Sequence, residues 1–343
     1  MVKMEDVARR ARVSTSTVSH VLNGTRKVSA QTVDAVQQAV RELGYIPNTL
    51  ARSLARSRTY TLGVAISALS NHYFSETVHA IETECARHGL MMLFADTHDD
   101  PVQELRVVEA LHHRRVDGIL LAPSSDPERA ALGYLRTHAI PTVLVDRLAA
   151  EGFDQVGVEN RASTQALVTH LIGHGHQRIG MIAGHRGLST TEERIEGYQQ
   201  ALSDANLKFD DRLLVNGQSN SESARRAALS LLALPVPPTA IMAANNLMTI
   251  GAMQALREAG VQVPDQMALV GFDDFDWADF FLPRLSVIAQ PVKALGERAV
   301  QLLLQRIDDP DGERQSERLP ATLRIRNSCG CPFGVPLKGI EPT

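Results

Sequence analysis

From Thr61 onward, short apolar segments of strand length alternate with longer segments of helical periodicity. The segments that we interpret as strands are 61–67, 90–96, 118–123, 142–146, 155–158, 178–183, 240–243 and 268–272. Because helical stretches separate most of them, we expect parallel sheets covered by helices. Some eight strands in about 270 residues are more than one small sheet needs, so this α/β body is predicted to have two lobes.

The first 58 residues differ in charge from the rest of the chain. They hold ten Lys and Arg residues against four Asp and Glu residues, a net charge of +6. Because the whole chain has a formal charge of −4, residues 59–343 must carry −10. A basic segment attached to an acidic body is typical of a polyanion-binding module joined to a soluble domain.

The basic segment has the pattern of three short helices. Ser14 and Ser29 are suitable N-caps for the second and third helices, and Gly44 supplies the stop of the third. Only Arg12 and Val13 separate the first two helices. So short a joint is typical of a helix-turn-helix motif.

In a helix-turn-helix motif the second helix enters the major groove of DNA. Alone, a run of Ser and Thr on a helix is more often a solvated face. On this helix, beside many cationic side chains, we expect hydroxyl, imidazole and amide groups to contact bases or phosphates. The candidate DNA-binding residues here are Thr15, Ser16, Thr17, Ser19, His20 and Asn23.

The run D-V-A-R-R-A-R-V-S-T-S-T-V-S-H-V-L-N resembles the signature of LacI/GalR-type transcriptional regulators, the lactose-repressor and purine-repressor family. The resemblance extends from Lys3 to about Asn327, and one departure is Arg12, where the family usually has Gly or Asn. It implies an all-α helix-turn-helix headpiece in 1–46, a hinge helix or linker in 47–58, and a two-lobed, periplasmic-binding-protein-like body for effector binding and dimerisation in 59–328. Lobe 1 is expected at about 59–159 and 291–319, and lobe 2 at about 160–289 and 320–328.

The hinge segment can form a helix of about two turns, from Asn48 to Ala55, which is too short to be stable alone. We expect it to fold on binding DNA. The resemblance implies that Leu54 wedges into a central base step while Arg52 and Arg56 hold neighbouring phosphates. Two Leu54 side chains from two subunits make a homodimer on a palindromic operator the natural unit. In the alternative interpretation, the apolar residues of this segment dock on the body.

Ligands of parallel α/β sheets bind beyond the carboxyl ends of the strands. Polar residues at those ends include Ser124, Asp146, Asn245 and Asp273. The resemblance aligns Phe74, Asp146, Thr190, Arg194, Asn245, Asp273 and Gln290 with effector contacts, and Tyr73 can supply an alternative aromatic face. The predicted effector-binding residues are therefore Tyr73, Phe74, Ser124, Asp146, Thr190, Arg194, Asn245, Asp273 and Gln290.

These side chains suit a sugar better than a purine. Arg194 offers a planar fork to vicinal hydroxyls or a carboxylate, and Asp146 and Asp273 accept hydrogen bonds from hydroxyls. Trp277 could stack on a sugar or pack in the fold. A nucleobase, a phosphosugar or a protein corepressor remains an alternative effector. The resemblance also implies three crossovers between the lobes, near residues 160, 290 and 320, through which a ligand could change the spacing of the hinge helices.

Other classes of protein lack support in the sequence. There is no G-x-G-x-x-G, P-loop or G-x-S-x-G motif, so no enzyme and no cofactor is expected. A sugar-transport protein would need a signal peptide, and no apolar run could span a membrane, so we expect a cytoplasmic protein without a membrane partner. Cys329 and Cys331 are half of a zinc site without a second Cys/His pair nearby in sequence, so no metal is predicted. The Gly- and Pro-rich tail, 329–343, is expected to be disordered.

Overall fold

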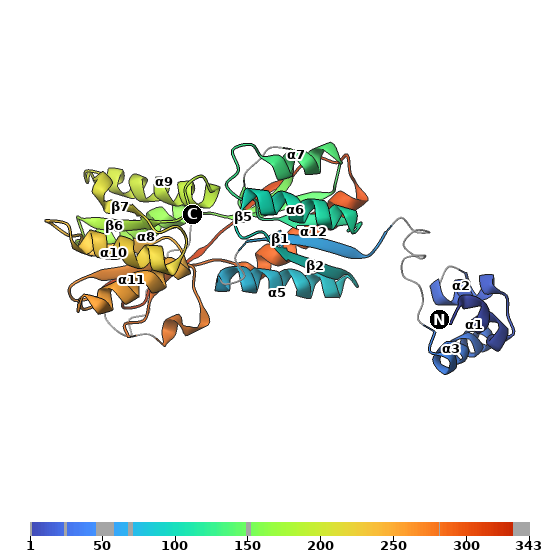
Figure 1. Cartoon of the computed structure of the whole chain (residues 1–343). Coiled ribbons are helices and arrows are strands. Elements are labelled where there is room, and N and C mark those ends of the chain that lie inside the picture. The colour runs from blue at the N-terminus through green and yellow to red at the C-terminus, as the bar shows by residue number, and fades with distance from the viewer. Residues whose placement is uncertain are drawn as a thin grey trace. The chain divides into compact units, whose positions relative to one another are not determined.

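Three helices form the headpiece, the first of two compact units, Met1–Thr59 and Tyr60–Thr343. They are α1 (Met4–Ala11), α2 (Thr15–Asn23) and α3 (Ala30–Leu43) (Figure 1). Val7, Val18 and Val36, one from each helix, are fully buried in one apolar cluster. The computed structural model describes residues 2–23, 26–45, 58–67, 71–148, 152–280 and 282–331.

The ends of the headpiece helices confirm the predicted caps. The Ser14 hydroxyl accepts from the backbone N–H of Thr17 at 3.1 Å, and the Ser29 hydroxyl accepts from that of Thr32 at 3.3 Å. Gly44 ends α3 in the left-handed conformation, with φ of 60°. Arg12, between α1 and α2, is also left-handed, with φ of 56°. A bulky cationic residue therefore occupies the turn position that favours glycine.

Lobe 1 is a parallel sheet with the strand order β11-β5-β4-β3-β1-β2. Its strands are β1 (Thr61–Ile66), β2 (Met91–Asp96), β3 (Gly118–Leu121), β4 (Thr142–Asp146), β5 (Asp154–Val158) and β11 (Ser316–Leu319). Its helices are α5 (His72–Arg87), α6 (Pro101–His113), α7 (Ala130–Thr137) and α12 (Val292–Asp308).

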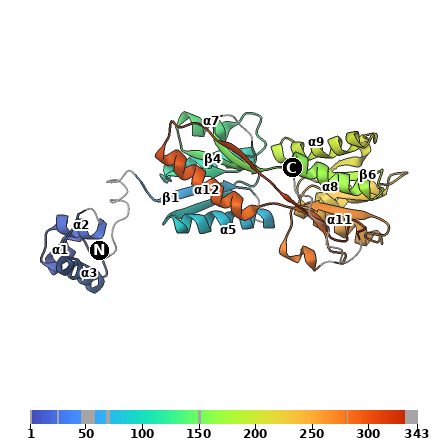
Figure 2. The same ribbon diagram turned by 180° about the vertical axis from the view of Figure 1, so that it is seen from behind.

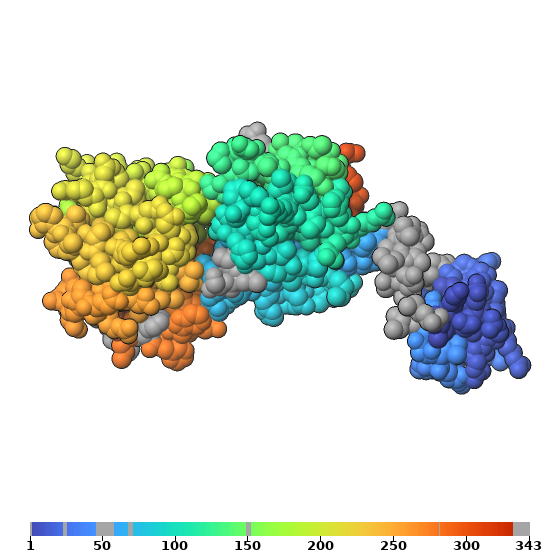
Figure 3. Space-filling view, viewed as in Figure 1, coloured from blue at the N-terminus to red at the C-terminus, as the bar shows by residue number. Residues whose placement is uncertain are grey.

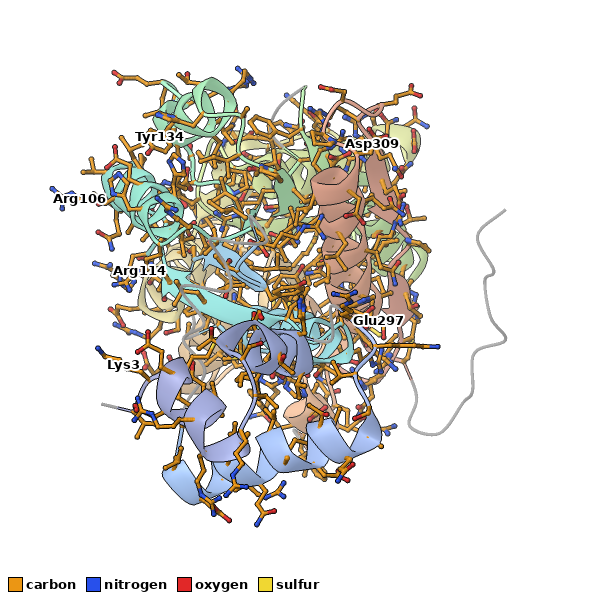
Figure 4. The ribbon with its side chains drawn as sticks, turned by 90° about the vertical axis from the view of Figure 1, so that its right-hand side faces the viewer. Lys3, Arg106, Arg114, Tyr134, Glu297 and Asp309 are labelled. Carbon is orange, nitrogen blue, oxygen red and sulfur yellow. The ribbon has the colours of Figure 1, made fainter. Side chains whose placement is uncertain are left out.

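The helices of lobe 1 cover both faces of its sheet, because successive residues of a strand point to opposite faces. Val64 of β1 packs with α5 and α12 on one face, and Ala65 packs with α6 and α7 on the other. The helices α5 and α12 lie side by side (Figures 1 and 2), where Arg87 pairs with Glu297 at 3.1 Å. Arg106 and Arg114 project outward from α6 (Figure 4).

Lobe 2 has the strand order β12-β10-β9-β8-β6-β7, and only β12 runs antiparallel to its neighbour. Its strands are β6 (Ile179–Ala183), β7 (Leu214–Asn216), β8 (Ala240–Ala243), β9 (Ala268–Phe272), β10 (Ser286–Ala289) and β12 (Thr322–Arg324). Its helices are α8 (Arg161–Gly173), α9 (Ser189–Asp204), α10 (Ser221–Leu232) and α11 (Asn246–Glu258), with 3-10 turns η1 (Asp211–Leu213) and η2 (Asp276–Asp279).

The chain crosses between the lobes after β5, after β10 and after β11, and the crossing segments are 159–160, 290–291 and 320–321. The two-lobed α/β fold with parallel sheets is thus the one expected from the sequence, and all eight predicted strands are present. The strands β7, β10, β11 and β12 were not predicted. No described helix has the length and apolar character that crossing a membrane requires.

Two sequence-based expectations concern segments that lie wholly or partly outside the described residues. The predicted hinge, 47–58, lies outside them except for Arg58, and so do Arg52, Leu54 and Arg56. The prediction that disorder begins at residue 329 is wrong for 329–331. The side chain of Cys329 is fully buried in lobe 2, and Cys331 is half-buried. Burial of an apolar thiol holds the chain there despite its Gly-rich composition.

Candidate functional site

A cavity lies between the two lobes of the body, beyond the carboxyl ends of their strands. Every predicted effector residue except Ser124 lines it. The lining residues among those predicted are Tyr73, Phe74, Asp146, Thr190, Arg194, Asn245, Asp273 and Gln290. Ser124 follows β3, but its backbone N–H donates to the Glu104 carboxylate at 2.5 Å, and it does not line the cavity.

The lobe 1 wall is built around Asp146, the last residue of β4. Its buried carboxylate accepts from the Tyr73 hydroxyl at 2.7 Å. Tyr73 is placed by the start of α5, where the N-cap Asn71 accepts from the Tyr73 backbone N–H at 3.0 Å. The aromatic ring and the carboxylate therefore reach the cavity from two elements that are far apart in sequence.

Arg147, the residue after Asp146, also contributes to the lobe 1 wall. Its guanidinium pairs with Asp99, donates to the Pro123 carbonyl at 3.0 Å, and lies 5.7 Å from the centre of the Phe74 ring. Both Asp99 and Arg147 line the cavity. The buried cation is paired with Asp99 and also lies 3.8 Å from the Asp146 carboxylate, so it balances the charge of both acids.

The lobe 2 wall is built around Arg194 of α9, whose side chain is 8% exposed. Its Nε donates to Asn160 Oδ1 at 2.8 Å, and its Nη1 donates to the Ala244 carbonyl at 2.6 Å. The guanidinium carbon lies 3.6 Å from the centre of the Phe272 ring, a cation–π contact. The plane of the guanidinium is thus fixed before any ligand arrives.

Asp273 follows β9 and holds the remaining polar groups in place. Its carboxylate accepts from the Asn246 backbone N–H at 3.2 Å and from Gln290 Nε2 at 2.5 Å. The Gln290 Oε1 atom is buried and has no hydrogen-bond partner among the described residues. Asn245 caps α11, accepting from the Met248 N–H at 2.8 Å. Gln290 therefore presents an unused acceptor beside the carboxylate.

Asp146 and Asp273 occupy equivalent positions in the two lobes, and both are left-handed, with φ of 69° and 77°. Left-handed residues other than glycine cost energy and concentrate at binding sites. Burial raises the pKa of both carboxyls above the usual aspartate range, and the nearby cations Arg147 and Arg194 oppose the shift. Burial, with Asp146 close by, also raises the pKa of Tyr73 well above its usual value. Tyr73 is thus a hydroxyl donor at neutral pH.

The lobes touch each other around the cavity. Arg318 of β11 pairs with Glu193 of α9 at 2.7 Å, and the rings of His72 and Trp277 lie 4.7 Å apart. The surfaces of the two lobes abut over much of the face shown in Figure 3. The space left inside the cavity is about 60 Å³, which is enough for about two water molecules. The side chains of the two lobes therefore leave little free space at this point, whereas a wider hollow of about 950 Å³, also lined by Tyr73, Asp273 and Gln290, lies beside it.

Several side chains differ from the expectation. Asp99 was not predicted, although its place three residues after β2 is a strand-end signal. Trp277 does not line the cavity; it is 40% exposed and packs against Phe275 and His72. Ser219 was not predicted either and lines the cavity with a small side chain.

In the headpiece, the predicted DNA-binding residues all belong to α2. Thr15 and Ser16 are exposed, Thr17, Ser19 and His20 are half-buried, and Asn23 is the last residue of the helix. The Ser14 hydroxyl lies 2.8 Å from both the Ser16 and the Thr17 hydroxyls. Among the cations of the headpiece, Arg10 is paired with Glu42.

The expectation of no metal site rested on the absence of a second Cys/His pair near Cys329 and Cys331 in sequence. The structure supplies one from α8, because His170 and His174 lie against these two cysteines. This cluster belongs to lobe 2 and is separate from the interlobe cavity.

Two family models match the chain. Residues 3–48 match the model of bacterial regulatory proteins of the lacI family, and residues 168–329 match that of the periplasmic binding protein-like domain. Among curated relatives, the ribose operon repressor of Escherichia coli K12 is 37% identical over 96% of this chain and its own full length. The HTH-type transcriptional repressor PurR of Photobacterium profundum is 34% identical over 96% of this chain and 98% of its own.

Solved structures agree with these matches. The lac repressor dimer bound to operator and the anti-inducer ONPF has a TM-score of 0.87 at 28% identity, covering 96% of this chain and 99% of that one. A LacI family transcriptional regulator from Enterococcus faecium with bound ribose has a TM-score of 0.69 at 27% identity, covering 78% of this chain and 98% of that one.

Proposed function

The chain belongs to the lacI family of bacterial regulatory proteins, and we propose that it is a repressor whose operator affinity is set by a pentose in the cleft. The wider activity, ligand-responsive DNA binding, is that of the family. The proposal concerns the class of effector, the residues that bind it and the route from the cleft to DNA.

One observation supports a sugar as the effector. Buried carboxylates from opposite lobes, Asp146 and Asp273, converge on one cavity that also contains the fixed guanidinium of Arg194. Adjacent sugar hydroxyls both donate and accept, so alternating carboxylate and guanidinium groups match them. A buried carboxylate without such a partner is costly, which favours a ligand rich in hydroxyls.

Two further features favour a small sugar. The cavity has little free space, and its aromatic residues Tyr73 and Phe74 lie on one side only. A flat base stacked between two rings would need a second aromatic wall, and Ser219 does not supply it. Among the similar proteins, relatives from three bacterial strains are named ribose operon repressor and one solved structure contains bound ribose, while other relatives are named PurR.

For the DNA-binding surface, we propose the exposed face of α2, with Thr15, Ser16 and Thr17 nearest its N-terminus. The N-terminal side chains of a recognition helix are those that meet base edges. Arg52, Leu54 and Arg56 are proposed as the minor-groove and phosphate contacts of the hinge. The lac repressor is solved as a dimer on its operator, and a dimer of this chain on a palindrome is the matching proposal.

The route from cleft to DNA passes through the lobes. A sugar ring is larger than the free space inside the interlobe cavity, so its entry must separate groups such as Arg318 and Glu193, or withdraw lining side chains. Lobe 1 begins directly after the hinge, and a change in lobe spacing alters the distance between the two hinges of a dimer. The ligand changes operator affinity only if it binds one arrangement of the two lobes more tightly than the other.

The test is ligand binding by the full chain, measured by thermal shift and calorimetry with ribose, other pentoses, hexoses, phosphorylated sugars and purine bases. At about 100 times its Kd, a ligand stabilises the fold by about 2.7 kcal/mol, which raises Tm by roughly 5 to 10 °C. We expect this for a pentose. Asp273→Asn should weaken binding about 10- to 100-fold, since a charged hydrogen-bond acceptor is lost.

Asp204→Asn is the matched control, because Asp204 lies at the end of α9, and within the described part of the chain its carboxylate accepts from Gln165 and Gln200. Its affinity for the pentose should be unchanged. A shift produced by a purine base and not by any sugar would contradict the proposed effector class. Equal binding by Asp273→Asn and the native chain would contradict the proposed site.

A further inference from the structure

Four metal-ligating side chains meet at one place in lobe 2, far from the effector cleft. His170 and His174 come from the C-terminal end of α8, and Cys329 and Cys331 come from the segment after β12. His170 and His174 are four residues apart, a spacing that places both on one face of a helix. The pairs are separated by about 160 residues of sequence, which is why the sequence alone did not connect them.

The distances between these side chains suit one ion. The Nε2 atom of His170 lies 3.3 Å from the Cys329 sulfur and 3.6 Å from the Cys331 sulfur, and the Nε2 atom of His174 lies 3.2 Å from the Cys331 sulfur. With Zn–S of about 2.3 Å and Zn–N of about 2.0 Å, sulfur and nitrogen ligands of a tetrahedral zinc ion lie about 3.5 Å apart. The ligand atoms of His170, Cys329 and Cys331 all lie within 4.8 Å of one another, whereas His174 lies outside that group and reaches it through its contact with Cys331.

The surroundings hold the cysteine segment in place. The Ser328 hydroxyl donates to the Leu269 carbonyl at 2.6 Å and accepts from the Ser286 N–H at 2.9 Å. The Ser286 hydroxyl in turn donates to the Cys329 sulfur at 3.2 Å. A hydroxyl donated to sulfur stabilises a thiolate, and such outer hydrogen bonds orient metal ligands.

The cluster also has an entry path. Cys329 is fully buried, Cys331 and His170 are half-buried, and His174 is exposed. An ion can therefore approach from the His174 side and be held at the buried sulfur. The site lies away from the effector cleft, because Ser328 is bonded near the start of β9 and Asp273 follows the other end of that strand.

We propose that His170, His174, Cys329 and Cys331 form a structural site for a zinc-type divalent cation. Two sulfurs and two imidazoles are the ligand set that zinc takes in closed structural sites. Each thiol releases its proton to solvent, and two thiolates balance the charge of the ion. The bound ion joins the segment after β12 to the end of α8. The assignment is independent of the proposed effector.

The test uses untagged, reduced, metal-free full-length protein titrated with Co²⁺ and then with Zn²⁺. We expect one cobalt per chain, with the visible bands of a tetrahedral site and a near-ultraviolet thiolate-to-cobalt band, both lost when zinc displaces it. Cys331→Ser and His170→Gln should each weaken binding by more than the roughly 100-fold that loss of an outer hydrogen-bond partner can cost. His174→Gln tests the fourth ligand in the same way.

Two control variants match these changes. Cys85→Ser removes a buried thiol of lobe 1, and His176→Gln removes the neighbouring histidine, which bonds Thr239 instead of the cluster. Both should bind cobalt as the native chain does. Operator binding by Cys331→Ser reports that the variant is folded. The proposal fails if the native chain gives no thiolate band, if Cys331→Ser binds as tightly, or if Cys329 and Cys331 form a disulfide in place of a site.

Discussion

At the scale of single residues, the main feature of the cleft is a pair of carboxylates, Asp146 and Asp273, whose charge is costly to bury. Asp146 and Asp273 each end or follow a buried strand in a left-handed conformation, and both line the interlobe cavity. The protein offsets part of that cost with Tyr73 and Gln290, which donate to them. A ligand that donates more hydrogen bonds to the same oxygens stabilises the ionised form further.

This arrangement predicts a pH dependence of effector binding. Burial raises the pKa of Asp146 and Asp273 above the usual aspartate range. Ligand hydroxyls donate to the ionised carboxylates, so affinity should fall as pH drops from neutral through the raised pKa values. Calorimetry across that range measures the effect, and in Asp273→Asn the dependence should be smaller.

The free energy of unfolding of the ligand-free chain should change with pH in the opposite direction to effector affinity. The two effects can therefore be distinguished. A carboxyl with a raised pKa in the fold destabilises the fold when ionised, so protonation at lower pH removes that cost. An effector affinity that stayed constant down to the usual aspartate range, or rose in acid, would contradict the role of these carboxylates.

Residues that come directly at the end of an apolar strand could be predicted to line the cleft. Residues placed there by contacts with parts of the chain distant in sequence could not. Asp146 and Asp273 were predictable because they come directly at the ends of apolar strands. Asp99 was missed because it follows β2 by three residues and its partner Arg147 is distant in sequence. Ser124 also follows an apolar strand, but it does not line the cavity, and its backbone N–H donates to Glu104.

At the scale of elements, the turn between α1 and α2 carries a strain that can be measured. Arg12 is left-handed there, a conformation that costs a residue with a Cβ atom about 1 kcal/mol more than glycine. Arg12→Gly should therefore give a headpiece about 1 kcal/mol more stable than Arg12→Ala gives, because both changes remove the same guanidinium.

Hydrogen exchange of the Val13 N–H in the full chain measures this difference, since that N–H bonds to the Ala8 carbonyl across the turn at 3.0 Å. Slower exchange in the Gly variant than in the Ala variant is the expected result. Equal exchange rates in the two variants would show that the turn is not strained.

Elements were predictable in proportion to their length and burial. Most interior strands of the two sheets contain apolar runs and were expected, with the exception of the short buried strand β10, S-V-I-A. By contrast, β11 reads S-E-R-L and β12 reads T-L-R, and both are edge strands with exposed positions. Their identity depends on pairing with β5 and β10, a long-range contact that local sequence does not contain.

At the scale of the whole molecule, the hinge links the two compact units. Leu54 lies outside the described residues, so its role rests on the sequence and the family. Leu54→Ala should weaken binding to a palindromic operator much more than binding to random DNA, since a wedge acts only at a specific, deformable base step. Fluorescence anisotropy with the two DNA duplexes at one salt concentration measures this. Equal losses on both would refute the wedge.

The link between ligand binding in the cleft and operator affinity could also be predicted only in outline. Three crossovers and two lobes follow from the pattern of the sequence and its resemblance, but the small cavity and the Arg318–Glu193 contact come from side-chain geometry. Those contacts determine how far a ligand must move the lobes.

The most direct test of the account is operator affinity measured with and without the pentose, in the native chain and in Arg194→Ala, with Arg212→Ala as control. Arg212 is exposed and pairs with Asp210 outside the cleft. The pentose should change operator affinity by roughly 5- to 150-fold in the native and control chains, and leave it unchanged in Arg194→Ala, whose affinity without ligand stays native. A pentose that binds the native chain without changing operator affinity, or an undiminished response in Arg194→Ala, would contradict it.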